Sequence, residues 1–171
     1  MSVDSLNEKR FLLLIPVGVF AILTFSGTSQ VWADVIEGTE GPDIIVGTPV
    51  DDLIDSKGGD DINEGDTELG DGSGNDVINS GEGDDENLGD TFIGDGSGDD
   101  IIVSGEGSDS NFGDTFEGQG SGDDIIVSGE EDDTNTGNGG RDIFVCGEGE
   151  DTVTDYNEAE GDIAAPDCEN I

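Results

Sequence analysis

Aspartate returns at a fixed place in a nine-residue pattern that runs through most of the chain. Eleven such units can be aligned, from GTEGPDIIV at residue 38 to CGEGEDTVT at residue 146, and the sixth position is aspartate in every one. The fourth position is glycine in nine units, and the eighth is apolar in seven. Carboxylates repeated in this way can bind cations if the fold brings successive copies together.

The overall charge raises the question of what neutralises so much acid. The 171 residues include 44 Asp and Glu but only 4 Lys and Arg, no histidine and 5% aromatics, for a formal net charge of -40. High charge with few aromatics is typical of disordered chains, which bury too little apolar surface to offset chain entropy. A disordered acidic linker would not hold a nine-residue register, however, so we expect a folded repeat. Such a charge would repel nucleic acid.

A longer repeat is superimposed on the nines. Six extra residues occur three times, as GDTELG (65–70), GDTFIG (89–94) and GDTFEG (113–118), and two nines plus six make a 24-residue super-repeat. Two sets of eighth-position residues recur with the period of this super-repeat: Ile54, Ile78, Ile102 and Ile126, and, one nonapeptide further on, Asn63, Asn87, Asn111 and Asn135.

Residue types predict the elements that carry these positions. Runs such as IIV favour extended backbone, and glycine-rich hexamers turn tightly. Turn, short strand, turn and short strand make one coil, and coils stacked at a fixed period make an all-β solenoid. Equivalent residues would then lie about 4.8 Å apart. We expect the isoleucines to form one inward column and the asparagines a second, joined as an amide ladder.

The same stacking would place the loop aspartates above one another. Bare carboxylates at about 5 Å repel, so the arrangement requires cations between them. Calcium suits best because it takes 6–8 oxygen ligands in flexible geometry, whereas zinc, copper and iron prefer the nitrogen and sulfur that this chain barely offers.

The units resemble a known family. DGSGDDIIV (95–103) and CGEGEDTVT (146–154) fit the motif G-G-x-G-x-D-x-U-x, with U apolar, of the hemolysin-type, repeats-in-toxin (RTX) calcium-binding repeats. The resemblance covers roughly residues 38–154 and implies a parallel β-roll in which half-sites from successive turns enclose each of several Ca²⁺ ions. The sixth-position aspartates would be the ligands: Asp43, Asp52, Asp61, Asp76, Asp85, Asp100, Asp109, Asp124, Asp133, Asp142 and Asp151.

The six-residue inserts depart from the family, whose turn consists of two nonapeptides alone. They either bulge out or add a third side to the coil, and we expect an added strand. Asp90 and Asp114 precede Thr-Phe in two inserts, which repeats the D-x-U spacing, so Phe92 and Phe116 are expected to point inward.

The N-terminus has the pattern of a secretory signal. Lys9 and Arg10 precede an apolar run at 11–25, and small residues end at Ala33, before a cleavage site at Asp34. We expect residues 1–33 to be removed, the alternative being an uncleaved anchor that would hold the chain to a membrane. The mature chain would be extracellular. In that compartment Cys146 and Cys168 favour a disulfide. Residues 34–154 would be the repeat domain and 155–171 a C-terminal cap.

Other motifs in the sequence are weaker indicators of function. Residues 71–82, DGSGNDVINSGE, partly match an EF-hand loop, but Asp76 stands where that loop needs glycine and no helical period flanks it. The chain has no histidine and only one pair of thiols, so the sequence offers no catalytic nucleophile with a neighbouring general base. We therefore do not expect the protein to be an enzyme. A non-catalytic half of a secreted hydrolase is disfavoured because the mature chain leaves no room for the other half.

These observations predict a secreted or cell-surface calcium-binding repeat protein whose folding depends on calcium bound between stacked Gly-Asp loops. The alternative is an extracellular adhesin that uses the calcium-loaded solenoid face to recognise a mineral, ice, glycan or cell surface.

Overall fold

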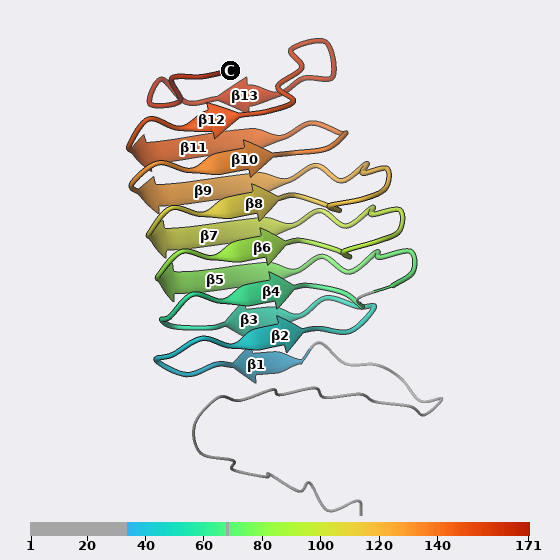
Figure 1. Cartoon of the computed structure of the whole chain (residues 1–171). Helices are drawn as coiled ribbons and strands as arrows, with labels where there is room; N and C mark the ends of the chain where they lie inside the picture. The colour runs from blue at the N-terminus through green and yellow to red at the C-terminus, as the bar shows by residue number, and fades with distance from the viewer. Residues whose placement is uncertain (1–33, 68) are drawn as a thin grey trace, which may run out of the picture.

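The computed structural model describes residues 34–67 and 69–171, so the predicted signal segment lies outside the described residues. The described chain forms two parallel sheets that face each other (Figure 1). The first sheet runs in the order β1 (Val35–Glu37), β3 (Leu53–Asp55), β5 (Val77–Glu82), β7 (Ile101–Glu106), β9 (Ile125–Glu130), β11 (Ile143–Glu148) and β13 (Ile163–Ala164). The second runs in the order β2 (Ile44–Val46), β4 (Ile62–Glu64), β6 (Glu86–Leu88), β8 (Ser110–Phe112), β10 (Thr134–Thr136) and β12 (Thr152–Val153).

Successive strands alternate between the two sheets, so the chain winds as a parallel β-roll. Ile36 pairs with Ile54 and Ile126 with Phe144, and each of these coils is two nonapeptides long. Ile54 pairs with Ile78, a coil of two nonapeptides and one insert. Both coil lengths keep one register because the extra residues lie in the connections, where the longer loops project from one edge of the roll (Figure 1). The predicted all-β roll with its longer super-repeat is confirmed.

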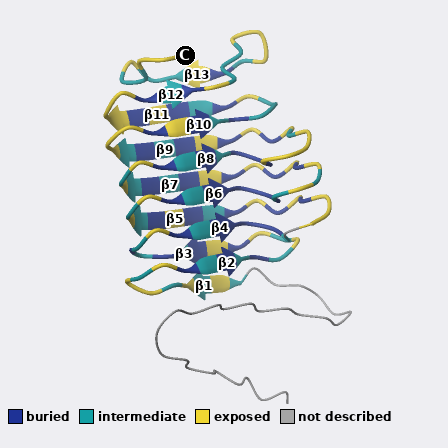
Figure 2. Ribbon diagram, in the orientation of Figure 1, coloured by how far each residue is buried: buried dark blue, intermediate teal, exposed yellow. Residues whose placement is uncertain are grey.

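The interior of the roll is narrow and largely polar. The isoleucine column is confirmed: Ile54, Ile78, Ile102 and Ile126 are fully buried and in register, and Phe144 continues the column. Figure 2 shows the buried residues along the strands and the exposed ones mainly in the connections. Among the described residues, 26 buried side chains are polar or charged and 9 are apolar. Apolar burial therefore supplies only part of what holds the coils together.

The asparagine column is also confirmed, as a continuous amide ladder. The Nδ2 atoms of Asn63, Asn87 and Asn111 each donate to Oδ1 of the asparagine one coil further on, at 2.9–3.0 Å. Three of the asparagines also donate to buried serine hydroxyls of the facing sheet, at Ser56, Ser80 and Ser128. Between its ends the polar core column satisfies itself, because each amide offers both a donor and an acceptor along the stacking axis, and Oδ1 of Asn63 at the first coil of the ladder has no partner.

The inserts do not add a strand, and the expected inward phenylalanines are wrong. Among the described residues, the inserts form two isolated bridges, Leu69 to Ile93 and Ile93 to Glu117, and single backbone hydrogen bonds between coils, but no named strand. Without a strand, no alternation places Phe92 and Phe116 inside: Phe116 is 47% exposed, and the two rings stack on each other at 5.1 Å. Phe116 also meets Phe112 of β8 edge-on, so the inserts fold against the outside of the second sheet. Thr91 and Thr115 take the buried places instead.

The C-terminal residues add a last, partial coil. Strand β13 pairs with β11, and Asn170 forms an isolated bridge with Thr152 of β12. A disulfide joins Cys146 of β11 to Cys168, at a sequence separation of 22. This cross-link ties the end of the chain to the last full turn of the roll. Within the described ranges no helix is long and apolar enough to cross a membrane.

Candidate metal centre

The structure gathers the predicted ligands into two columns, one along each edge of the roll. The aspartates that precede strands of the first sheet form one column, here called the wide edge because the inserts lie on this side: Asp52, Asp76, Asp100, Asp124 and Asp142. Those that precede strands of the second sheet form the narrow edge: Asp43, Asp61, Asp85, Asp109, Asp133 and Asp151. All eleven are buried.

Each column is built by one repeated hydrogen bond. The backbone N–H of one aspartate donates to Oδ1 of the aspartate one coil further on. On the wide edge Asp76 N–H reaches Asp100 Oδ1 at 2.6 Å, and Asp100 N–H reaches Asp124 Oδ1 at 2.8 Å. On the narrow edge the corresponding bond from Asp85 N–H to Asp109 Oδ1 is 2.8 Å long. In ten of the eleven aspartates, all except Asp43, one carboxylate oxygen accepts a backbone N–H of the preceding coil.

The second oxygen, Oδ2, lacks a donor in most of these residues. At Asp52, where a loop is short, Thr48 donates to Oδ2 from both its N–H and its hydroxyl. Eight predicted ligands have a buried Oδ2 with no hydrogen-bond partner: Asp61, Asp76, Asp85, Asp100, Asp109, Asp124, Asp133 and Asp151. A buried carboxylate oxygen without a partner is costly, and a repeated row of them indicates a ligand that they share.

The electrostatics agree with this interpretation. Burial, followed by repulsion from stacked carboxylates, raises the pKa of Asp124 to about 9. Burial also raises the pKa of Asp100 to about 10, against the hydrogen bond from Asp76 N–H. On the narrow edge burial raises the pKa of Asp133 to about 7. Near neutral pH these buried carboxyl groups therefore either hold a proton or need a cation to offset their charge.

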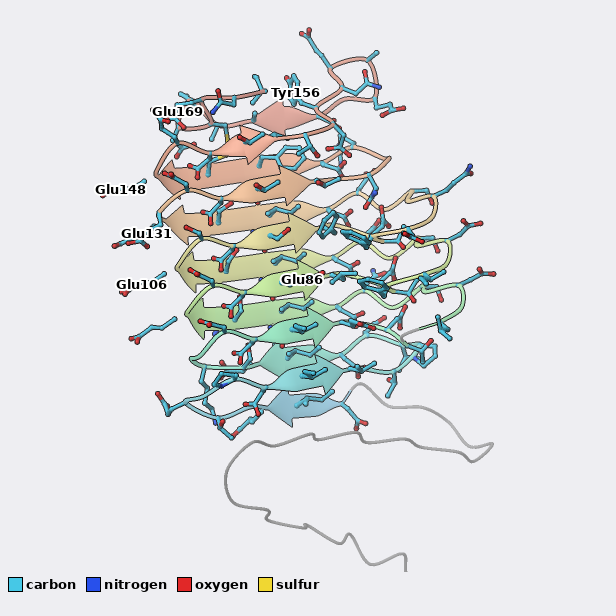
Figure 3. The ribbon with its side chains drawn as sticks, in the orientation of Figure 1. Glu86, Glu106, Glu131, Glu148, Tyr156 and Glu169 are labelled. Carbon is cyan, nitrogen blue, oxygen red and sulfur yellow. A yellow bond between two sulfur atoms is a disulfide. The ribbon has the colours of Figure 1, made fainter. Side chains whose placement is uncertain are left out.

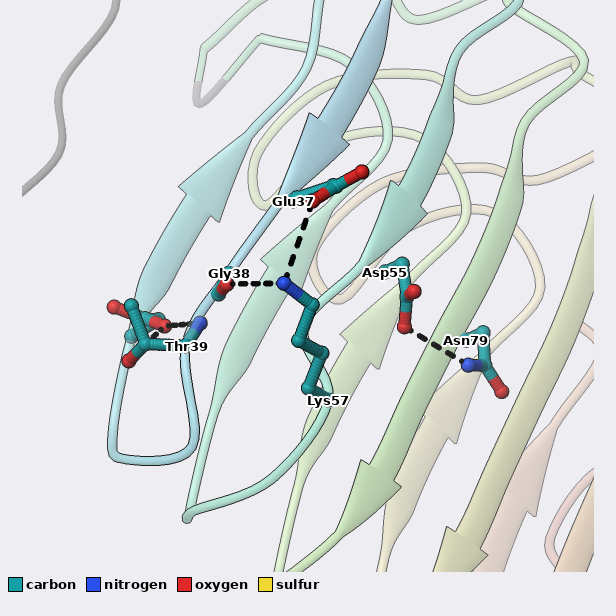
Figure 4. A network of polar contacts seen from close by, with 7 residues as sticks. Glu37, Gly38, Thr39, Asp55, Lys57 and Asn79 are labelled. Carbon is teal, nitrogen blue, oxygen red and sulfur yellow. Dashed lines mark hydrogen bonds and ion pairs between the residues drawn. The ribbon is translucent and has the colours of Figure 1, made fainter. Parts of the chain in front are cut away.

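The basic side chains of the described residues do not supply that offset. Arg141 pairs with Asp123 at 3.1 Å on the surface, where both side chains are half-exposed. Lys57 reaches Glu37 at 3.4 Å and the carbonyl of Gly38 at 3.0 Å, also at the surface (Figure 4). Neither cation lies within the aspartate columns.

The glycines of the loops bring backbone oxygens close to the same carboxylates. A Cβ added at Gly89 would overlap both the carbonyl oxygen of Gly113 and Oδ2 of Asp100. The Gly89 position thus has to be glycine because two oxygens, one carbonyl and one carboxylate, converge on it. A donor set of carboxylates and carbonyls is the set that calcium prefers.

The comparison with known families decides the identity of the repeat. The family model of the RTX calcium-binding nonapeptide repeat matches the sequence in four copies, over residues 33–62, 63–86 and 119–153. The chain belongs to this family. The RTX repeats of the chain bind Ca²⁺, and the two sheets are the flat sides of an RTX roll. No curated protein and no solved structure matches the chain.

The match leaves out residues 87–118, which hold two of the inserts, yet the RTX roll continues through them. Strands β7 and β8 pair with their neighbours in the same register as the matched coils. Asp100 and Asp109 lie in this segment and occupy the same columns as Asp76 and Asp85. The inserts lengthen the coil without changing the ladder that each RTX unit makes.

Sequence reasoning missed several acids at the edges of the RTX roll, all of them buried except Glu169, which is exposed. The insert aspartates Asp66, Asp90 and Asp114 are fully buried on the wide edge. At the C-terminal end, Asp162 accepts from Asp142 N–H and Glu169 from Asp151 N–H, so the cap continues both columns. The repeated GDT at the start of each insert was a usable signal for the first three. The two cap acids lie outside any repeat, and only the fold reveals them.

Proposed function

We propose that the protein is a secreted or cell-surface protein whose RTX roll folds when calcium binds between its stacked loops. The observation that carries the proposal is the row of buried Oδ2 atoms without hydrogen-bond donors along both edges of the roll. The sixth-position aspartates are proposed as the ligands, each joining its coil to the next. Binding, and not catalysis, is the proposed activity of the repeats.

The proposed dependence on calcium follows from magnitudes. An independent site adds about 1.4 kcal/mol to stability when free calcium is ten times its dissociation constant. Several such sites together match the roughly 5–15 kcal/mol that stabilises a whole domain. Apolar burial is small in this roll, so calcium decides whether the coils stay stacked. Extracellular calcium modules bind at about 10⁻⁴–10⁻³ M, which fits an extracellular location.

The test is to compare the mature chain in a chelator and in millimolar calcium. We expect a coil-like far-UV circular dichroism spectrum in the chelator and a β-rich spectrum in calcium, with a smaller hydrodynamic radius. Calorimetric titration gives the number of ions. A β-rich, compact chain in the chelator would end the proposal, and so would an absence of calcium uptake.

A second candidate function is recognition of an extracellular surface. Glu82, Glu106, Glu130 and Glu148 are exposed and pair in register on neighbouring strands of the first sheet, so they form a regular row of carboxylates with a spacing of about 4.8 Å. Figure 3 shows Glu106 and Glu148 projecting from the same edge. Such a row of carboxylates fits the cations at a mineral surface better than it fits a neutral glycan or ice. Retention of the calcium-loaded protein on calcium carbonate tests it, and a protein that washes through would rule it out.

A further inference from the structure

The six-residue inserts bring their own aspartates onto the wide edge of the roll. Asp66 N–H donates to the carbonyl of Asp90, and Asp90 N–H to that of Asp114, both at 2.9 Å. The insert aspartates are therefore stacked in register, like the sixth-position aspartates beside them. All three are fully buried, although no strand holds them.

Three carboxylates from two successive coils meet at the first insert. One carboxylate oxygen of each of Asp66, Asp76 and Asp90 lies within 4.8 Å of the other two. Asp66 and Asp76 come from one long loop and Asp90 from the insert of the next coil. Their exposed fractions are 0%, 1% and 0%, so water does not screen the three charges from one another.

The hydrogen bonds of these residues leave one oxygen of each without a partner. Asp66 Oδ2 accepts from the N–H groups of Ser73 and Gly74, at 2.6 and 3.1 Å, and Oδ1 accepts none. Asp76 Oδ1 accepts from Asp52 N–H at 2.6 Å, and Oδ2 accepts none. Asp90 Oδ2 accepts from Gly98 N–H at 3.1 Å, and Oδ1 accepts none. Each carboxylate is thus fixed by one oxygen and offers the other.

The loop is shaped to lie against this group. A Cβ added at Gly72 would lie 2.6 Å from Asp66 Oδ2 and 2.8 Å from Asp90 Oδ1. Only glycine at this position lets the backbone of the loop pass beside both insert carboxylates. Three clustered carboxylates, each with one buried unpartnered oxygen, and the close backbone make a built cluster, which differs from a chance gathering of surface acids.

We propose that Asp66, Asp76 and Asp90 bind one divalent cation, of the calcium class, at a site to which the nonapeptide motif contributes Asp76 alone. Two of the three ligands come from the inserts, so the ion clamps the long loops of two coils together. The proposal rests on the proposed function only in that it takes the roll to be folded in calcium. Calcium is the expected ion because all the donors are oxygens.

The third insert aspartate provides a matched control. Asp114 is as deeply buried as Asp66 and stands at the same place in its insert. Gly122 N–H, however, donates to both of its oxygens, at 3.1 and 3.4 Å. With both oxygens engaged, Asp114 is not expected to bind an ion of its own.

A proton shared between Asp66 and Asp90 is the alternative that would relieve the repulsion without a metal.

The experiment counts calcium ions bound by the mature chain, using equilibrium dialysis and calorimetry at pH 7.5. Asp66→Asn keeps an oxygen for the two N–H donors but removes the ligand charge, and we expect it to bind one ion fewer than the wild type. Asp114→Asn should bind the full number. Asp71→Asn, an exposed acid of the same loop, controls for net charge and should also bind the full number. Folding of each variant in calcium is checked by circular dichroism.

The outcomes separate this proposal from the proposed function. A wild type that takes up no calcium overturns the proposed function. A wild type that folds with calcium, while Asp66→Asn binds as many ions as it does, overturns the insert site alone and favours the shared proton. If Asp66→Asn does not fold, Asp90→Asn takes its place with the same expected loss of at least one ion. An equal loss in Asp114→Asn would also overturn the site, because it would show a general effect of removing buried charge.

Discussion

The backbone N–H of Asp76 donates to Oδ1 of Asp100 across 2.6 Å, and Oδ2 of Asp100 stays buried without a donor. This pair shows how one residue type serves both the fold and the site. The first oxygen aligns successive coils, and the second is the proposed ligand of a cation. Because the same relation repeats along both edges of the roll, we expect coil stacking and calcium binding to depend on each other.

Substitution of Asp100 by asparagine should have opposite effects with and without calcium. Asparagine keeps an oxygen for Asp76 N–H but removes the carboxyl group of Asp100, whose pKa burial raises to about 10. We expect Asp100→Asn to be more β-structured than the wild type in chelator, and to need at least about tenfold more calcium to fold fully, a loss of about 1.4 kcal/mol. Circular dichroism during calcium titration measures both.

The control for this substitution is Asp99→Asn. Asp99 is exposed, although its Oδ1 also accepts a backbone N–H one coil away, from Asp123 at 2.9 Å. Asp99→Asn should therefore change little the calcium concentration at which half of the protein is folded. Equal shifts in the two variants would mean that net charge alone, and not ligation by Asp100, sets the midpoint.

Acidic pH should partly replace calcium in stabilising the folded chain. Burial raises the folded-state pKa of Asp109 and of Asp133 to about 7, from an ordinary value of 3.8. The folded chain therefore holds more protons than the unfolded chain between these values. The stability that protonation provides is full below about pH 4 and is lost as pH rises through about 7.

In chelator we thus expect more β-structure at pH 5 than at pH 8; pH 5 avoids precipitation near the isoelectric point of about 4.1. In calcium the trend should reverse, because protons compete with the ion for the same oxygens. Far-UV circular dichroism over this pH range checks both signs. A chelated chain that gains structure toward pH 8 would contradict the assignment of the buried carboxylates.

The asparagine ladder should contribute strongly to stability. Asn111→Ala leaves Nδ2 of Asn87 without its acceptor and removes the donor to Asn135 Oδ1, both in a fully buried column. We expect a loss of about 2–4 kcal/mol in calcium, from the unsatisfied amide and the cavity. Urea unfolding in saturating calcium measures it, with Ser110→Ala on the outer face as control. A loss no larger than that of the Ser110→Ala control would show that the ladder is dispensable.

The disulfide should stabilise the C-terminal end. Cys146 and Cys168 close a loop of 22 residues, for which chain entropy predicts about 3 kcal/mol. The paired Cys146→Ser and Cys168→Ser variant should unfold at a lower temperature in millimolar calcium, with fraying that begins at β13. Thermal unfolding with hydrogen exchange locates the loss. If exchange at β13 equals that of the wild type, the cross-link does not hold the cap.

The sequence by itself determined the periodic part of this protein. The recurrence of aspartate in every nonapeptide, and of isoleucine and asparagine in every super-repeat, predicted a solenoid of stacked coils, its two inner columns and its use of calcium, and the resemblance to the RTX repeats implied the parallel roll. A regular repeat allows this because one local rule, applied to each coil, fixes the register of all of them.

Tertiary structure alone decided what happens where the repeat is interrupted. The insert sequences predict a further strand with inward Phe92 and Phe116, but these two rings stack on each other, and Phe116 meets Phe112 edge-on. The insert aspartates are buried instead. The spacing of residues cannot predict this, because a segment without ladder pairing has no strand alternation to obey. Which oxygen of each carboxylate binds the backbone and which stays unpartnered depends likewise on the stacking of coils far apart in sequence, which exists only once the chain has folded.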